Sequence, residues 1–329
     1  MKRSKVVLRV DGDNKIGLGH LYRTINLAKE LRKKKFQVIF LTRSNMAKKI
    51  IPKFFKIVML NNNSKNSQKN IIQNLHADIV IIDKLYEDSF TIKILNKNSK
   101  HLIGIDYTGK NKHLIKNGIN MLYPKSGIKD KNSYSGLKYA ILNDSFKKIK
   151  STPISKDVKK LLVLQGGADT PCFTPEIIDS LNSIEENVKI TVVLGSSFKC
   201  WKKLKNSVQN SKKPLKILHG VKSMAPLMAK HDLVISGGGM TLLELTSLGI
   251  PSIIICGAKF ENETAESLSK KGFGINIGYS KKLSKRKITK AVRELMYNYN
   301  LRKNMNKIGK TLVDGNGAER IVNIISKVV

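Results

Sequence analysis

Short apolar runs alternate with amphipathic stretches along nearly the whole chain, and this alternation restricts the fold more than any other feature. In the first half, Leu21, Ile25, Ala28 and Leu31 recur at helical spacing between two apolar runs. Near-continuous apolar strands separated by amphipathic helices are typical of a parallel sheet that is covered on both faces. The predicted strands of this half are residues 6–10, 38–41, 57–60, 79–82, 102–105 and 119–122.

A second alternation follows a polar stretch, residues 125–157, and predicts a second sheet of the same kind. We place a linker at 147–158 and expect the polar run 61–70 to be a mobile loop. The predicted elements of this half are strands at 161–164, 190–194, 215–218, 233–235, 253–255 and 274–277, and helices near 175–184, 223–230, 241–248, 263–271 and 284–297.

The length of 329 residues suits two domains. We predict an N-terminal Rossmann-like domain at 1–150, a C-terminal one at 151–315 and a final amphipathic helix at 316–329. Doubly wound sheets bind ligands at the carboxyl ends of their strands, so two such α/β domains would form a ligand-binding cleft. No apolar run approaches the roughly 18 residues that span a bilayer. No signal-peptide core follows Lys5, so we expect a cytoplasmic chain.

The chain carries 61 Lys and Arg against 24 Asp and Glu, a formal net charge of +37. Such an excess suggests an anionic partner, which could be a nucleic acid, an anionic lipid or a phosphorylated substrate. Because the lysines are spread along the whole chain and no RNA-binding signature is present, we favour a solvated basic surface over nucleic-acid binding. The charge is also compatible with weak attachment to a membrane surface, and no obligate protein partner is inferred.

The three cysteines, Cys172, Cys200 and Cys256, share no close spacing. Their odd number and the lack of a CxxC motif argue against both a disulfide framework and a zinc site. Cys256 lies in a buried-strand pattern, where cysteine acts as a small hydrophobe. We therefore predict no metal and no other cofactor.

The turn after the first predicted strand contains the candidate catalytic residue. Gly17-Leu18-Gly19-His20 opens a helix, whose N-terminal N–H groups and dipole favour an anion. Histidine exchanges protons near neutral pH, so His20 is the candidate general base. Arg23 follows one helical turn later, and its planar fork of donors suits phosphate. The simpler alternative is a tight turn with a surface histidine. The predicted substrate contacts of this segment are Asp11, Gly17, Gly19 and Arg23.

Two glycine-rich turns of the second half could hold phosphates on backbone N–H groups. The first is Gly166-Gly167-Ala168-Asp169, which taken alone is better interpreted as an ordinary strand-to-helix turn. The second is Ser236-Gly237-Gly238-Gly239, which leads directly into a helix. Glu244, in the early part of that helix, could accept hydrogen bonds from ribose hydroxyls, or merely stabilise the helix dipole. The second turn matches neither a Walker A nor a GxGxxG sequence, which argues against an ATPase and a Rossmann dehydrogenase. The predicted nucleotide contacts are Gly166, Gly167, Gly237, Gly238, Gly239, Thr241 and Glu244.

Several other polar residues are weaker candidates. Asn262 could contact a sugar, or could equally cap a helix. Asp83, Asp106 and Asp144 lie at strand or loop ends, where we favour a capping or turn role over substrate contact. The other histidines have no partner at useful spacing and are interpreted as structural or surface residues: His76, His101, His113, His219 and His231.

Taken together, these segments resemble the UDP-2,4-diacetamido-2,4,6-trideoxy-β-L-altropyranose hydrolases of pseudaminic acid synthesis. The matching pieces follow the family order over nearly the whole chain: residues 9–12, 17–23, 136–142, 166–169, 236–238, Glu244, 248–251, Asn262 and Ala265. The resemblance implies a GT-B fold, shared with the UDP-N-acetylglucosamine transferase of peptidoglycan synthesis, and a last helix that crosses back to the first domain. It also implies that His20 is the catalytic base and that the second domain binds UDP.

The chain departs from the family pattern at three places. Asp106-Tyr107 stands where the family has two adjacent aspartates, Asn262-Glu263 where it has Asn-Gln, and Gly136-Leu137 where it has Gly-Pro. These departures bear on the identity of the sugar more than on the fold. The resulting prediction is a hydrolase that removes UDP from a UDP-linked diacetamido-trideoxy sugar by His-assisted attack of water. The alternatives are a GT-B glycosyltransferase that uses a UDP-sugar donor, and a basic nucleic-acid-binding protein.

Overall fold

The computed structural model describes residues 3–13, 18–60, 64–123, 125–149 and 154–328. The chain divides into two compact units, unit 1 with residues 1–143 and 315–329, and unit 2 with residues 144–314. The division falls just before helix α5 (Asp144–Lys148), which packs on α9 (Met240–Leu248) of unit 2. This contact explains why the division comes a few residues before the linker predicted at 147–158.

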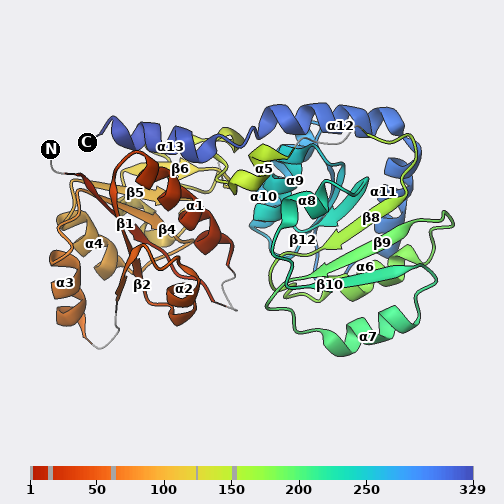
Figure 1. Cartoon of the computed structure of the whole chain (residues 1–329), viewed down its shortest axis with the longest axis horizontal. Coiled ribbons are helices and arrows are strands. Elements are labelled where there is room, and N and C mark those ends of the chain that lie inside the picture. The colour runs from red at the N-terminus through yellow and green to blue at the C-terminus, as the bar shows by residue number, and fades with distance from the viewer. Residues whose placement is uncertain (1–2, 14–17, 61–63, 124, 150–153, 329) are drawn as a thin grey trace. The chain divides into compact units, whose positions relative to one another are not determined.

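Unit 1 is built on a seven-stranded, all-parallel sheet in the order β3-β2-β1-β4-β5-β6-β7 (Figure 1). Six strands were predicted, and the seventh consists of only two residues, too few to form an apolar run. The strands are β1 (Lys5–Arg9), β2 (Gln37–Thr42), β3 (Lys56–Met59), β4 (Ile79–Asp83), β5 (His101–Ile105), β6 (Asn117–Asn120) and β7 (Tyr134–Ser135). The helices are α1 (Gly19–Lys33), α2 (Asn45–Ile50), α3 (Lys65–Gln73), α4 (Ser89–Lys97), α13 (Gly317–Ser326) and the 3₁₀ turns η1 (Lys110–Leu114) and η2 (Leu137–Tyr139).

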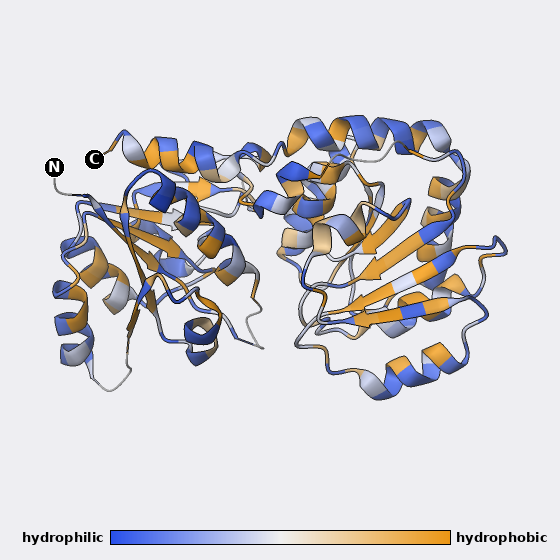
Figure 2. Cartoon of the chain, viewed as in Figure 1, coloured by the Kyte–Doolittle hydropathy of each residue, from blue (hydrophilic) through white to orange (hydrophobic). Residues whose placement is uncertain are grey.

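The core of unit 1 follows the predicted periodicity. Leu21, Ile25, Ala28 and Leu31 of α1 are buried, and most residues of the strands β1, β2, β4 and β5 are apolar (Figure 2). Apolar residues of α3 and α4 pack with those of the sheet in a second cluster. The C-terminal helix α13 packs on α1 and η2, so the end of the chain belongs to unit 1.

The prediction of a mobile loop at 61–70 was wrong from Ser64 onward. The Ser64 hydroxyl accepts a 3.0 Å hydrogen bond from the Ser67 N–H and caps α3, and Ile72 of the same helix is buried. A serine N-cap and one buried face are enough to hold a helix that is otherwise polar. Residues 61–63 lie outside the described part of the chain.

Unit 2 contains a six-stranded, all-parallel sheet in the order β10-β9-β8-β11-β12-β13. Ser284 caps α11 by accepting from the Lys287 N–H, as the sequence suggested. The strands are β8 (Lys160–Leu164), β9 (Lys189–Leu194), β10 (Leu215–His219), β11 (Leu233–Ser236), β12 (Ser252–Cys256) and β13 (Ile275–Tyr279). The remaining helices are α6 (Phe173–Leu181), α7 (Trp201–Gln209), α8 (Met224–Met228), α10 (Glu261–Lys270), α11 (Lys285–Tyr297) and α12 (Tyr299–Leu312).

Both sheets reverse their strand order at one point, between β1 and β4 in unit 1 and between β8 and β11 in unit 2. Open α/β sheets bind their ligands at such a point, outside the carboxyl ends of the strands. The GxGH turn follows β1, and the two glycine-rich turns follow β8 and β11. Topology therefore places all three predicted motifs at the switch points.

Candidate functional site

His20 pairs with Asp83 at the switch point of unit 1. His20 is the second residue of α1, Asp83 is the last residue of β4, and the His20 Nδ1 atom lies 2.7 Å from Asp83 Oδ1. The Asp83 side chain is 1% exposed and that of His20 is 14% exposed, so the imidazole is the member of the pair that solvent reaches. The sequence interpretation of Asp83 as a capping or turn residue was therefore wrong.

The contacts of Nδ1 assign the tautomer of His20. A carboxylate can only accept, so the short contact to Asp83 places the proton of the neutral ring on Nδ1. Arg23 Nη2, which carries two protons, donates to Asp83 Oδ1 at 2.5 Å and also lies 3.0 Å from Nδ1, so we base the tautomer on the shorter contact of Nδ1 with the carboxylate. The other ring nitrogen, Nε2, then carries the lone pair. An imidazole oriented in this way by a buried carboxylate is the arrangement of a general base.

Asp83 is held in the ionised form. Burial acts to raise its pKa, but the charges and hydrogen bonds of Arg23 and His20 outweigh burial and bring the pKa well below its ordinary value. The Thr24 hydroxyl donates a further hydrogen bond of 2.6 Å to Asp83 Oδ2. The carboxylate can therefore stabilise a positive charge on His20 across the physiological pH range.

Arg23, which was predicted to contact phosphate, is buried inside unit 1 and paired with two carboxylates. It is 2% exposed and bridges Asp83 and Asp106, with Nη1 2.7 Å from Asp106 Oδ2. Asp106 in turn accepts hydrogen bonds from the backbone N–H groups of Met121 and Leu122, and burial raises its pKa. Arg23 shares a helix face with His20, as predicted. Its guanidinium donates to the Asp83 carboxylate and so orients the carboxylate that contacts His20.

Asp11 is likewise engaged inside unit 1. Its carboxylate pairs with Arg9 and Lys84 and accepts the Arg43 N–H. Burial opposes its ionisation, yet the charges of Arg9 and Lys84 prevail and bring the pKa of Asp11 well below its ordinary value. Asp11 is therefore an ion-pair partner inside unit 1, and its contact with substrate stays a prediction. Gly19 begins α1, and Gly17 lies outside the described residues.

The glycine turns of unit 2 lie side by side at the carboxyl edge of the sheet, because Leu164 of β8 pairs with Ser236 of β11. At Gly166, which has φ +72°, and at Gly167, a Cβ atom would meet no other described heavy atom within 4 Å. The backbone of this turn is accordingly open to a ligand. Gly239 precedes α9 without a side-chain cap, and Thr241 lies in the first turn of that helix.

Gly238, a predicted nucleotide contact, packs closely against α10. A Cβ at this position would lie 2.9 Å from the Glu261 Cβ, so the glycine permits α10 to approach closely. The Glu261 carboxylate accepts a 2.8 Å hydrogen bond from the Gly257 N–H and is also bonded by the N–H groups of Gly238 and Ala258. Burial still raises its pKa. The Gly238 N–H is therefore directed at Glu261.

Two further predicted contacts are placed by the structure. Asn262 does not cap α10, which begins at Glu261; its side chain donates to Glu266 and accepts from Asn276 instead. Glu244 lies in α9, is partly buried, and burial raises its pKa to about 8. At neutral pH its carboxyl group is therefore mostly protonated and can donate as well as accept a hydrogen bond.

The prediction of no disulfide was wrong. Cys172 and Cys200 form one, with a Cα–Cα distance of 5.8 Å, whereas Cys256 is free and buried as expected. The two residues are 28 positions apart and meet only because β8 and β9 are parallel neighbours. Within the described ranges, no cluster of three His, Cys, Asp or Glu side chains could hold a metal ion. Over those same residues, every helix is too short or too polar to cross a bilayer.

Comparison with known proteins identifies the architecture. The structure matches MurG of Acinetobacter baumannii with a TM-score of 0.73, 13% identity and coverage of 99% of this chain and 100% of that one. A glycosyltransferase of Rickettsia africae matches with a TM-score of 0.70 and 14% identity, over 100% of this chain and 99% of its own. The fold is that of the GT-B glycosyltransferases. Residues 160–321 also match the glycosyltransferase family 28 C-terminal domain.

Curated relatives are similar over part of their length. An uncharacterized protein of Methanocaldococcus jannaschii, MJ1062, is 32% identical over 285 residues, which cover 81% of this chain and 58% of that protein. The spore coat polysaccharide biosynthesis protein SpsG of Bacillus subtilis is 25% identical over 58% of this chain and 57% of its own length. The chain thus spans less than two-thirds of the length of these two relatives.

Proposed function

We propose that this protein detaches the sugar of a UDP-sugar and passes it to an acceptor hydroxyl, the reaction of a glycosyltransferase. The observation that carries the proposal is the His20–Asp83 pair at the switch point of a GT-B sheet. It is supported by the family 28 match of unit 2 and by three curated relatives named as UDP-N-acetylglucosamine transferases, which align with 52–55% of the chain.

In the proposed reaction, Nε2 of His20 takes the proton of the attacking hydroxyl. The hydroxyl oxygen forms a bond to the anomeric carbon, and the bond from that carbon to the UDP oxygen breaks, so that UDP leaves with the electron pair. Asp83 stabilises the imidazolium that results. General-base assistance of this kind contributes about 10²–10⁴-fold to the rate.

We propose that unit 2 binds the UDP portion. Gly166 and Gly167 leave their backbone open, and the N-terminus of α9 at Gly239 and Thr241 favours negative charge. Preorganised N–H donors of this type stabilise the charge that develops on the leaving diphosphate. Glu244, with its raised pKa, is proposed to share hydrogen bonds with the ribose hydroxyls.

Hydrolysis is the second candidate, with water in place of the acceptor. It is favoured by the position of His20 in the GxGH turn, a segment in which the sequence resembles hydrolases of UDP-linked 2,4-diacetamido-2,4,6-trideoxy sugars. The base has the same task in both reactions, because water and an alcohol each lose one proton on attack.

A panel of UDP-sugars, incubated with the purified protein with and without candidate acceptors, separates the two reactions. UDP release that requires an acceptor supports the transferase, and nuclear magnetic resonance should then show a glycosylated product. Release of free sugar without any acceptor supports the hydrolase. If the protein neither binds UDP nor releases it from any donor, both proposals are wrong.

A further inference from the structure

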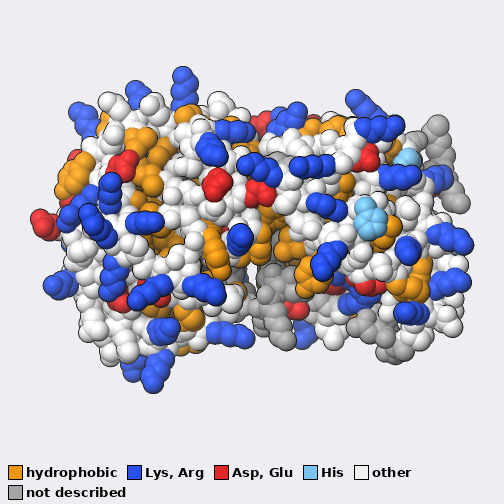
Figure 3. Space-filling view, turned by 180° about the vertical axis from the view of Figure 1, so that it is seen from behind, with side chains coloured by type: hydrophobic (Ala, Val, Ile, Leu, Met, Phe, Trp, Pro, Cys, Tyr) orange, Lys and Arg blue, Asp and Glu red, His pale blue; other side chains and the backbone are white. Residues whose placement is uncertain are grey.

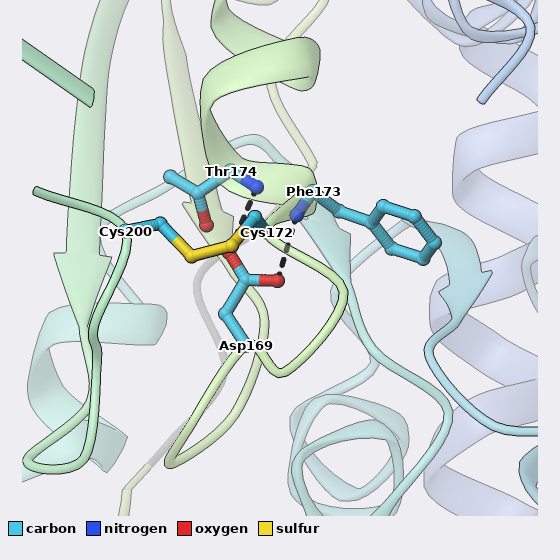
Figure 4. Close-up of a disulfide and its surroundings, with 5 residues drawn as sticks. All are labelled: Asp169, Cys172, Phe173, Thr174 and Cys200. Atoms are coloured by element: carbon cyan, nitrogen blue, oxygen red, sulfur yellow. Dashed lines mark hydrogen bonds between the residues drawn. A yellow bond between two sulfur atoms is a disulfide. The ribbon is translucent and has the colours of Figure 1, made fainter. Parts of the chain in front are cut away.

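The Cys172–Cys200 disulfide joins two turns at the carboxyl edge of the unit 2 sheet (Figure 4). Cys172 ends the β8–α6 turn, which begins with Gln165 and contains Gly166 and Gly167, and Cys200 precedes α7. The bond therefore lies in the same turn as the two glycines whose backbone is open to a ligand. The proposed reaction makes no use of either cysteine.

The backbone of the β8–α6 turn is held in an unfavourable conformation. Gly166, Asp169 and Cys172 have φ values of +72°, +44° and +61°, all in the left-handed region. Glycine adopts this region freely, but Asp169 and Cys172 do so at a cost in free energy. Such a conformation persists only where the surrounding contacts hold it in place.

Three sets of contacts hold this turn. The Asp169 carboxylate accepts hydrogen bonds of 2.9 and 2.8 Å from the N–H groups of Phe173 and Thr174, at the start of α6. The Ser197 N–H donates to the Gly167 carbonyl at 3.0 Å. The disulfide is the third, and the covalent, connection. It fixes the end of the turn to the loop that leads into α7.

Cys172 and Cys200 differ from Cys256, the third cysteine, in their exposure to solvent. Cys172 and Cys200 are both partly exposed. Cys256 is fully buried in β12, and burial raises the pKa of its thiol to about 12. Because the thiolate is the reactive form, Cys256 is poorly suited to exchange with the disulfide.

We propose that the Cys172–Cys200 disulfide is a reversible redox modification site, opened by dithiol reductants, and that its opening loosens the 165–172 turn and weakens the binding of UDP there. The part that concerns UDP rests on the proposed function, whereas the loosening of the turn does not.

The exchange reaction balances with a dithiol as the named co-reactant. One thiolate of the dithiol attacks a sulfur of the disulfide, the S–S bond breaks, and the other cysteine leaves as a thiolate that takes up a proton. The second thiol of the reagent then closes its own disulfide and releases the remaining cysteine thiol. The protein gains two electrons and two protons, and the dithiol loses them.

The test compares the full chain in its oxidised state and after treatment with dithiothreitol. Mass spectrometry of alkylated thiols defines the two states, with one free thiol expected before reduction and three after it. Hydrogen exchange of the 165–172 amides is measured without ligand, and UDP affinity is measured by calorimetry. On reduction we expect exchange in this turn to accelerate on the order of tenfold and UDP affinity to fall severalfold. The double variant C172S/C200S should behave as the reduced protein and should not respond to dithiothreitol.

The outcomes separate this inference from the proposed function. Equal exchange in the two states, or equal UDP affinity despite faster exchange, overturns the inference and leaves the proposed function intact. A double variant that still responds to dithiothreitol also overturns it. If UDP binds in neither state, the proposed function and the UDP part of the inference are both wrong. In that case, hydrogen exchange of the 165–172 amides still tests whether the disulfide holds the turn in place.

Discussion

The Nδ1 atom of His20 and the Oδ1 atom of Asp83 lie 2.7 Å apart, although 63 residues separate them in the sequence. One belongs to the first turn of α1 and the other to the end of β4, and the parallel pairing of β1 with β4 brings the two elements together. The carboxylate is buried and the imidazole is partly accessible. The contact therefore supplies an oriented base at the sheet edge, where α/β proteins bind their ligands.

Replacing His20 with Asn should abolish most of the proposed activity. Asn has no nitrogen that accepts a proton near neutral pH, so UDP release from the best donor should fall by about 10²–10⁴-fold. Since UDP is proposed to bind unit 2, its affinity, measured by calorimetry, should stay within about twofold of the wild type. A variant with wild-type turnover would exclude His20 as the base.

The substitution Asp83→Asn should lower the stability of unit 1, because it leaves the buried charge of Arg23 with Asp106 as its remaining carboxylate partner among the contacts described. Breaking a buried ion pair from one side costs about 3–5 kcal/mol, measurable by urea denaturation. The exposed Asp130→Asn is the matched control and should change the free energy of unfolding by less than about 0.5 kcal/mol.

The Asp83 carboxylate also makes the free energy of unfolding depend on pH. Because the folded-state pKa of Asp83 is lowered, its contribution is present above the unfolded-state value of about 3.9 and is lost as the pH falls below it. Urea denaturation between pH 7 and pH 3 should therefore show a steeper loss for the wild type than for Asp83→Asn. Parallel curves would contradict the assigned ion pair.

Most of the fold could be predicted from the sequence, because local signals determine its elements. The strands β1, β4, β8 and β12 are apolar along most of their length. A nearly continuous apolar run is the sequence pattern expected of a strand that is buried on both faces. The helix α3 was missed because seven of its nine residues (KNSQKNIIQ) are polar, so apolar periodicity is weak, and because its cap, Ser64, lies in a run of Asn, Ser and Lys.

The details of the site depend on contacts between distant residues, which one sequence does not reveal. His20 was found because it follows a glycine turn, but Asp83 could be recognised only once β1 and β4 were known to be neighbours. Arg23 was assigned to phosphate because its type suits an anion, and the structure shows that the anions are Asp83 and Asp106. The basic surface itself shows no single concentrated patch on the face in Figure 3, where Lys and Arg are scattered.

Glu244 should make unit 2 less stable as the pH rises through neutrality. Its folded-state pKa, about 8, lies above the unfolded-state value of about 4.3. The contribution of the Glu244 carboxyl group to stability is therefore fully present below pH 4.3 and is lost progressively as the pH rises to 8. Glu244→Gln keeps the shape and removes the ionisation. Urea denaturation at pH 8 should find this variant more stable than the wild type by on the order of a few kcal/mol, with little difference at pH 5. A wild type that is equally stable at both pH values would contradict the raised pKa.

Arg302 should be essential to the stability of unit 2. Its guanidinium is fully buried and donates to four backbone carbonyls, those of Leu295, Met296, Ser155 and Lys156. Arg302→Met leaves these acceptors without that donor, and we expect a loss of about 2–4 kcal/mol in the free energy of unfolding. The exposed Arg286→Met on α11 is the control, for which a change below about 0.5 kcal/mol is expected.

Gly167→Ala tests whether a ligand approaches the open turn of unit 2. The site is exposed, its backbone is outside the left-handed region, and an added Cβ meets no described heavy atom within 4 Å. The free energy of unfolding should therefore stay within about 0.5 kcal/mol of the wild type. If the diphosphate packs against this backbone, the methyl group obstructs it, and UDP affinity should fall by about tenfold, since 1.4 kcal/mol corresponds to that factor. A stable variant with unchanged affinity would place the diphosphate elsewhere, which leaves the first turn of α9 as the remaining proposed contact.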